Sequence, residues 1–218
     1  MTEDPYYKSR YTFDPRRSII WGQIVEFESK YIPENSTVVD LGAGYCDFIN
    51  NVKAAKKYAV DISAELPNYA GNEVAQISSS VTDLSGISTS SVDIVHASNL
   101  LEHFSDSDLE MIMNEIERVL KSGGKLILMQ PNYRLSHKNY FDDPTHKKVF
   151  SDASLESFLI SHGFKIILKK PRFLPFSMKS NSSLIPHTLL GLIVRLYIKS
   201  PIKPFAGQML FIAEKKDA

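Results

Sequence analysis

The stretch from Thr37 to Ile49, TVVDLGAGYCDFI, most constrains what this chain can fold into. It opens with a short apolar run of the kind that a buried parallel strand needs. Gly42 and Gly44 follow at once, and glycines tolerate a positive φ and let a ligand approach the backbone closely. A helix that begins near Asp47 would present N–H groups to whatever lies over the turn. The stretch predicts a strand, a ligand-binding glycine turn and a helix.

Two kinds of cofactor use a glycine turn of this type. A dinucleotide fingerprint needs the pattern G-x-G-x-x-G, and here the third glycine is missing after Gly42 and Gly44. The carboxylate of Asp40, two positions before the turn, suits a cationic cofactor better than a pyrophosphate. The pattern therefore disfavours an NAD-dependent oxidoreductase, which stays open as an alternative.

The rest of the chain alternates strand and helix patterns. Strands are predicted at 38–41, 57–60, 74–77, 92–97, 125–129, 165–168 and 208–213. This alternation predicts an α/β fold with a doubly wound, mostly parallel, seven-stranded sheet. The 218 residues with 43% hydrophobic content are most simply one domain. We divide it into an N-terminal arm and helix (1–35), a cofactor-binding core (37–131), an acceptor loop (132–150) and a cap (171–207).

Three features resemble class I S-adenosylmethionine-dependent methyltransferases. They are the D-L-G-A-G run at 40–44, the acid Asp61 at the end of the next strand, and the L-E-H-F segment at 101–104. The resemblance covers about 37–131 and 151–170, and it implies a Rossmann-like fold and S-adenosylmethionine as cofactor. A piece at 173–180, with the start at Asp14, looks like methyltransferases of bacterial surface-glycan assembly.

The resemblance also implies roles for individual residues. It assigns the glycine turn to the cofactor's amino-acid portion, Asp61 to the ribose hydroxyls, Asp83 to the adenine amino group and 97–99 to the methionine side. No metal site is predicted. The cofactor residues implied are Asp40, Gly42, Ala43, Gly44, Asp61, Ile62, Thr82, Asp83, Ala97, Ser98 and Asn99.

Two histidines are candidate catalytic bases on the acceptor side, His146 first and His103 second. A hydroxyl acceptor must lose a proton, and histidine accepts one near neutral pH. The alternatives are a role in the loop structure or in packing near the cofactor for His103, and a solvated loop position for His146. Tyr140, Asp143 and Tyr11 are candidate substrate-binding residues, the last in an aromatic arm that could close over the cofactor. We expect O-methylation of a small molecule or glycan, nucleotide-linked or lipid-linked. N- or carboxyl-methylation and a non-catalytic cofactor-binding module stay open.

Charge and cysteine content limit the partners. Lys+Arg 25 and Asp+Glu 25 balance, so nucleic acid is not expected. The single cysteine, Cys46, excludes an internal disulfide and a Cys-cluster zinc site. Residues 157–213 contain eight basic residues and no acid. We therefore expect the cap to contact an anionic acceptor or an acidic membrane surface. Its many apolar residues could also contact a second subunit. The N-terminus lacks a signal pattern, so the predicted location is the cytoplasm.

Overall fold

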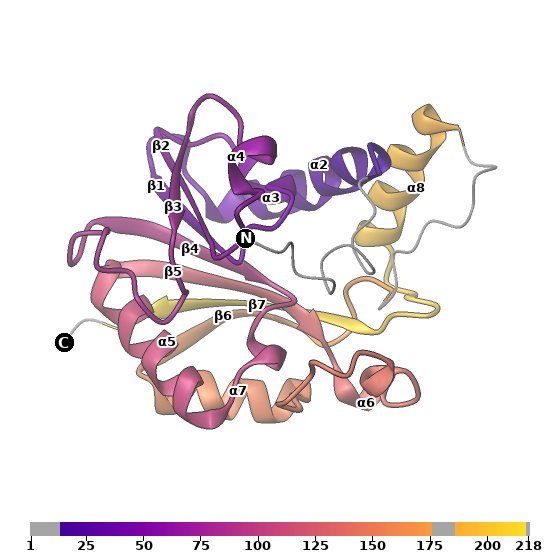
Figure 1. The fold of residues 1–218 in the computed structure, drawn as a ribbon. Helices are drawn as coiled ribbons and strands as arrows, with labels where there is room; N and C mark the ends of the chain where they lie inside the picture. Colours follow the sequence, from indigo (N-terminus) through magenta and orange to yellow (C-terminus); the bar gives the residue numbers. More distant parts are fainter. Residues whose placement is uncertain (1–13, 176–185, 217–218) are drawn as a thin grey trace.

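The computed structural model describes residues 14–175 and 186–216. Within them the strands form a seven-stranded sheet in the order β3-β2-β1-β4-β5-β7-β6 (Figure 1). All pairs from β3 to β5 are parallel, and β7 is antiparallel to both of its neighbours. This confirms the predicted mostly parallel α/β sheet. The strands are β1 (Thr37–Leu41), β2 (Lys56–Asp61), β3 (Val74–Ser78), β4 (Val92–Ser98), β5 (Leu120–Pro131), β6 (Phe164–Lys170) and β7 (Gln208–Lys215).

Helices cover both faces of the sheet (Figure 1). On one face, α2 (Arg16–Glu28), α3 (Asp47–Asn51) and α8 (His187–Lys199) contribute to one apolar core. On the other face, α5 (Asp106–Val119) and α7 (Asp152–Ser161) contribute to a second core. The shorter elements are η1 (Ser29–Tyr31), α4 (Leu66–Tyr69), η2 (Leu101–His103), α6 (Tyr133–Ser136) and η3 (Tyr140–Asp142).

The sheet reverses direction between β1 and β4. The chain proceeds from β1 outward to β2 and β3, and then returns to place β4 on the other side of β1. Leu41 and Ala97 pair at the ends of these two strands. Ligands of open α/β sheets bind at the carboxyl edge beside such a switch point. The glycine turn and the segment after β4 therefore lie next to each other at this edge.

The boundary between α5 and β5 differs from the prediction. Ser105 begins α5 with a capping box, in which its side chain accepts from the Asp108 amide. However, α5 ends at Val119 and β5 starts directly at Leu120, so Gly123 and Gly124 lie inside the strand. The register with β4 shifts here, from Val92↔Leu120 to Ile94↔Lys125, so that residues 121–124 lie opposite the single residue Asp93. The two glycines lie in this irregular part of the strand and not at the end of the helix.

The cap is anchored on α2 through α8, which packs along it (Figure 1). Arg195 Nη2 lies 2.9 Å from Glu26 Oε1 of α2. The Lys203 ammonium donates to the last carbonyls of α8, those of Tyr197 and Ile198. Thus two of the cap's cations are already engaged. No helix of the described ranges is long and apolar enough to cross a membrane.

Candidate active site

The glycine turn has the backbone that its sequence predicts. Gly42 has φ +65° and Gly44 has φ +51°, values that only glycine adopts without strain. The Gly42 amide donates to the Val60 carbonyl over 2.9 Å, which ties the turn to β2. A Cβ atom on Gly42 would lie 2.6 Å from Leu100 Cδ1. Leu100, just after β4, therefore packs into the space that the absence of a side chain at position 42 leaves open.

Asp61 lies beside this turn. Its side chain is buried, and its Oδ2 accepts the Gly44 N–H over 2.8 Å while Oδ1 accepts the Ser63 N–H over 2.8 Å. Each carboxylate oxygen can accept more than one hydrogen bond, so hydroxyl donors fit here as well. The next residue, Ile62, is 71% exposed, an apolar surface beside the carboxylate. A carboxylate, a glycine backbone and an exposed apolar side chain fit an adenosine with its cationic sulfur substituent.

Asp40 is placed differently from the other predicted cofactor residues. Its side chain is buried below the turn, with Oδ1 2.8 Å from Nδ1 of His96 on β4. Burial raises the pKa of Asp40, and the neighbouring imidazole opposes this rise. Glu28 at the end of α2 is also fully buried, and burial raises its pKa to about 7. Sequence reasoning missed Glu28 and His96, because other polar residues stand close to each of them and no local pattern marks them as buried.

Cys46 follows the turn in a left-handed conformation, with φ +58°. This backbone explains why a glycine suits the position, since a side chain there is strained. The thiol is buried, and burial raises its pKa to about 12. A thiol that stays protonated at neutral pH is a poor nucleophile, so Cys46 has a packing role.

The end of β4 brings Ala97, Ser98 and Asn99 to the same edge. Asn99 has φ +48°, a conformation that asparagine tolerates better than most residues. Its main-chain N–H donates to the Met129 carbonyl over 2.8 Å, and its side-chain Oδ1 accepts from Gln208 Nε2 over 2.9 Å. These bonds connect the ends of β4, β5 and β7, and so fix the start of the segment that leads to His103.

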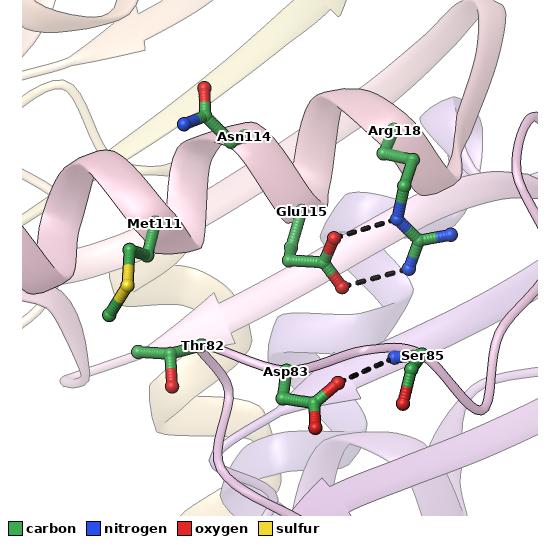
Figure 2. A pocket seen from close by; sticks show the side chains of 7 residues that line it. All are labelled: Thr82, Asp83, Ser85, Met111, Asn114, Glu115 and Arg118. Carbon is green, nitrogen blue, oxygen red and sulfur yellow. Dashed lines mark hydrogen bonds and ion pairs between the residues drawn. The ribbon is translucent and has the colours of Figure 1, made fainter.

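Asp83 lies in the loop after β3, five residues beyond the end of the strand at Ser78. β3 ends at Ser78, and the side chain of Asp83 accepts the Ser85 amide over 3.0 Å in the exposed loop beyond. Figure 2 shows Thr82 and Asp83 with α5 residues, among them Met111 and Glu115, around a hollow of about 540 Å³. The adenine-binding roles of Thr82 and Asp83 stay predictions.

Two residues of α5 that form an ion pair with each other also hold the same loop. Arg118 Nε and Nη2 donate to the two carboxylate oxygens of Glu115 over 2.7 and 2.8 Å (Figure 2). Arg118 also donates to the carbonyls of Leu84 and Ile87. This pair therefore has a structural role in holding the loop.

The two predicted histidines meet in space although they are 43 residues apart in the numbering (146 − 103). Their ring centroids are 4.9 Å apart. The amides of Lys147 and Lys148 donate to the Glu102 carbonyl over 2.8 and 3.0 Å, which straps the loop of His146 onto η2. Because η2 follows β4, this histidine pair lies on the carboxyl edge next to the glycine turn.

The neighbours of the histidines come from the predicted acceptor loop. His146 Nδ1 lies 2.6 Å from the Tyr140 carbonyl, and His103 Nδ1 lies 2.8 Å from Thr145 Oγ1. Thr145 Oγ1 in turn donates to Asp143 Oδ1 over 2.6 Å. Tyr140 is fully buried and its hydroxyl donates to the Lys148 carbonyl over 2.5 Å.

Tyr140 and Asp143 thus support the histidines in this structure, and their roles in binding an acceptor stay predictions. Tyr11 lies outside the described residues. Glu102 was not predicted as a site residue, although it belongs to the L-E-H-F segment. Its carboxyl group is buried against the histidine pair, and burial, with Asp143 nearby, raises its pKa to about 8.

Comparisons with known proteins agree with this geometry. A methyltransferase domain family matches residues 13–169. An uncharacterized protein of Methanocaldococcus jannaschii is 30% identical over 162 residues, which is 73% of this chain and 68% of that protein.

Solved structures share the fold at low identity. A methyltransferase from Archaeoglobus fulgidus, described as SAM-dependent, has a TM-score of 0.70 at 19% identity and covers 97% of this chain and 100% of its own. A possible histamine N-methyltransferase from Thermotoga maritima has a TM-score of 0.66 at 20% identity, covering 92% and 91%. The chain belongs to the methyltransferase domain family, and it is an S-adenosylmethionine-dependent methyltransferase.

Proposed function

We propose that this enzyme methylates a hydroxyl oxygen of a small molecule or glycan. The observation that supports this choice is the histidine pair, His103 and His146, on the cofactor edge of the sheet. A hydroxyl is a weak nucleophile until it loses its proton, whereas a free amine or a carboxylate needs no base. Two imidazoles next to the predicted cofactor site suit a hydroxyl acceptor better than an amine or a carboxylate acceptor.

The cofactor, when bound, supplies an electrophilic methyl group on a sulfonium. The chain's own residues have three tasks around it. The glycine turn and Asp61 would bind the cofactor, and Ala97 to Asn99 would line its reactive side. The histidine pair would take the proton of the acceptor hydroxyl, with His146 as first and His103 as second candidate. Holding both reactants in line contributes a large part of the rate in such displacements.

The cap, residues 171–207, supports an anionic or lipid-linked acceptor. It lies outside the residues that the methyltransferase family matches, which end at 169. Four apolar residues of α8 point to solvent: Leu189, Leu192, Ile193 and Leu196. An apolar helix face on a segment without acidic residues is complementary to the surface of an anionic membrane. We propose that the cap contacts such a membrane peripherally, where a lipid-linked glycan would be presented.

Methyl transfer with a labelled cofactor tests the acceptor class. The enzyme is incubated with carbon-13 methyl-labelled S-adenosylmethionine and a panel of nucleotide sugars, lipid-linked glycans, phenols, amines and carboxylates. NMR of the product distinguishes an O-methyl from an N-methyl group. We expect an O-methyl product.

Histidine variants then test the base. His146→Ala should lower turnover by about 100-fold or more, with cofactor affinity changed by less than about threefold. His103→Ala should have a smaller effect. His162→Ala is the matched control, because His162 pairs with Glu110 on α5, away from the pair. An N-methyl product, or wild-type turnover in both pair variants, would contradict the proposal.

A further inference from the structure

Glu102, His103 and His146 form a compact group of potential metal ligands. Each of them offers a nitrogen or oxygen atom, and these atoms all lie within 4.8 Å of one another. Ligand atoms at roughly 2.1 Å from one ion in a tetrahedral site lie about 3.4 Å apart. The three side chains therefore need to close by up to about 1.4 Å to share one ion.

Hydrogen bonds in the second layer fix the tautomer of both imidazoles. The Tyr140 carbonyl can only accept, so His146 Nδ1, at 2.6 Å, carries the proton. The Thr145 hydroxyl gives its own proton to Asp143, so at 2.8 Å it must accept from His103 Nδ1. In its neutral form, each ring thus has its lone pair on Nε2. An imidazole that donates through one nitrogen to an oxygen and ligates through the other is the arrangement that protein metal sites use.

Glu102 supplies a second, independent observation. Its side chain is only 1% exposed, and neither carboxylate oxygen has a hydrogen-bond partner among the described residues. Burying such a group without a partner is costly, and native proteins nearly always pair it or coordinate a metal with it. A cation at this position would satisfy both oxygens.

We propose that Glu102, His103 and His146 bind one divalent transition-metal ion. Two imidazoles and one carboxylate suit Zn²⁺, Fe²⁺ or Mn²⁺ better than the hard ions Ca²⁺ and Mg²⁺. Three protein ligands leave a coordination position for a further oxygen, such as a water or an acceptor hydroxyl.

One consequence, unlike the site itself, rests on the proposed function. An acceptor hydroxyl that binds the ion becomes more acidic and releases its proton to solvent more readily. The histidines would then hold the ion. The ion would lower the pKa of the hydroxyl, so that no protein base is needed.

Titration of the full-length enzyme with Zn²⁺ tests the site. Protein treated with a chelator and then freed of it is titrated by calorimetry, and Co²⁺ absorption in the visible region reports on the ligands. We expect one ion per chain. Glu102→Gln and His146→Gln should each weaken binding by at least about 100-fold, and Thr145→Val, which removes the contact to His103, by about 10-fold. His162→Gln is the matched control, because its Nε2 lies 3.2 Å from Glu110 Oε2 with no third ligand among residues 14–175 and 186–216, and it should bind as the wild type does.

Two sets of outcomes separate this inference from the proposed function. Absence of Zn²⁺ binding in the wild type, or equal binding in Glu102→Gln, His146→Gln and wild type, overturns the metal site even if methyl transfer is intact. Zn²⁺ binding that follows the three residues supports the site even if no hydroxyl acceptor is methylated. Circular dichroism and S-adenosylmethionine affinity report on folding. If Glu102→Gln fails to fold, His146→Gln alone decides.

Discussion

The Nδ1 atom of His96 lies 2.8 Å from Oδ1 of Asp40, inside the protein and two residues before the glycine turn. The His96 ring stacks on Phe48 of α3, with centroids 3.6 Å apart, and Trp21 of α2 meets its edge. Glu28 is buried in the same region, and neither of its carboxylate oxygens has a hydrogen-bond partner among the described residues. The cofactor turn is therefore supported by the buried Asp40–His96 pair, which joins β1 and β4. Trp21 and Glu28 of α2 lie close to this pair.

This arrangement predicts a pH-dependent stability. Burial raises the pKa of Glu28 from 4.5 to about 7, with the His96 interaction opposing and that of Asp40 adding to the rise. Between these two pH values the unfolded chain gives up a proton that the folded protein keeps. The protonated Glu28 therefore makes its full contribution to the free energy of unfolding below about pH 4.5. This contribution, roughly 3 kcal/mol, is lost as the pH rises through about 7.

Glu28→Gln removes this titration. The difference in free energy of unfolding between the variant and the wild type should shift in favour of the variant by roughly 3 kcal/mol from pH 4.5 to pH 8. Urea unfolding across this range measures it. Glu26→Gln is the control, because Glu26 is on the same helix but exposed and paired with Arg195. A difference between Glu28→Gln and wild type that stays constant with pH would contradict the assignment.

Much of the fold followed from the sequence for identifiable reasons. Short apolar runs separated by helical stripes predicted the strands, and the glycines at 42 and 44 predicted the turn that the structure shows. The register shift at Gly123 and Gly124 was not predictable, because a glycine pair after a helix is equally typical of a helix end and of an irregular strand. The antiparallel direction of β7 depends on long-range pairing with β5 and β6, which a local pattern does not encode.

The candidate site was predicted in part. His103 and His146 were chosen separately, and only the three-dimensional path of the loop after β5 brings them together. The buried environment of Glu102 and of Glu28 has no local signature, since an acid next to apolar residues is normally solvent-exposed. One cation of the cap is paired with an acid from a distant element, Arg195 with Glu26 of α2, which the sequence alone did not indicate.

Asp61 is expected to dominate cofactor affinity. Asp61→Asn keeps the size of the side chain but removes the charge, and hydrogen bonds to a charged group contribute about 1.5–3 kcal/mol. Calorimetry should show S-adenosylmethionine binding weakened by at least about 10-fold. Asp83→Asn is the comparison, because Asp83 is exposed and bonded to Ser85, and its effect should be smaller. Equal losses of affinity in the two variants would support Asp83 as an adenine ligand. Wild-type affinity in both variants would contradict the role of Asp61.

The left-handed backbone of Cys46 predicts an unusual order of stability. Ala normally stabilises a chain relative to Gly, because glycine gains more freedom on unfolding. At φ +58° a Cβ atom is strained by about 1–2 kcal/mol. Cys46→Gly should therefore be as stable as Cys46→Ala or more so, by up to about 1 kcal/mol. Cys46→Val, which is β-branched, should be the least stable of the three. Thermal unfolding of the three variants measures this order, and an Ala variant clearly above the Gly variant would contradict the strain.

The exposed face of α8 predicts binding to anionic membranes. Co-sedimentation with vesicles of phosphatidylglycerol and phosphatidylcholine should retain the wild type at low salt and release it as salt rises, because exposed cations near the surface contribute about 1 kcal/mol each. Leu192→Ser with Leu196→Ser removes apolar contact at two exposed positions and should weaken binding without lowering stability. Ile160→Ser is the control, since Ile160 is also exposed but lies on α7, away from the cap. If the wild type stays in solution with vesicles at low salt and forms a dimer that Leu192→Ser disrupts, this face is a subunit interface instead.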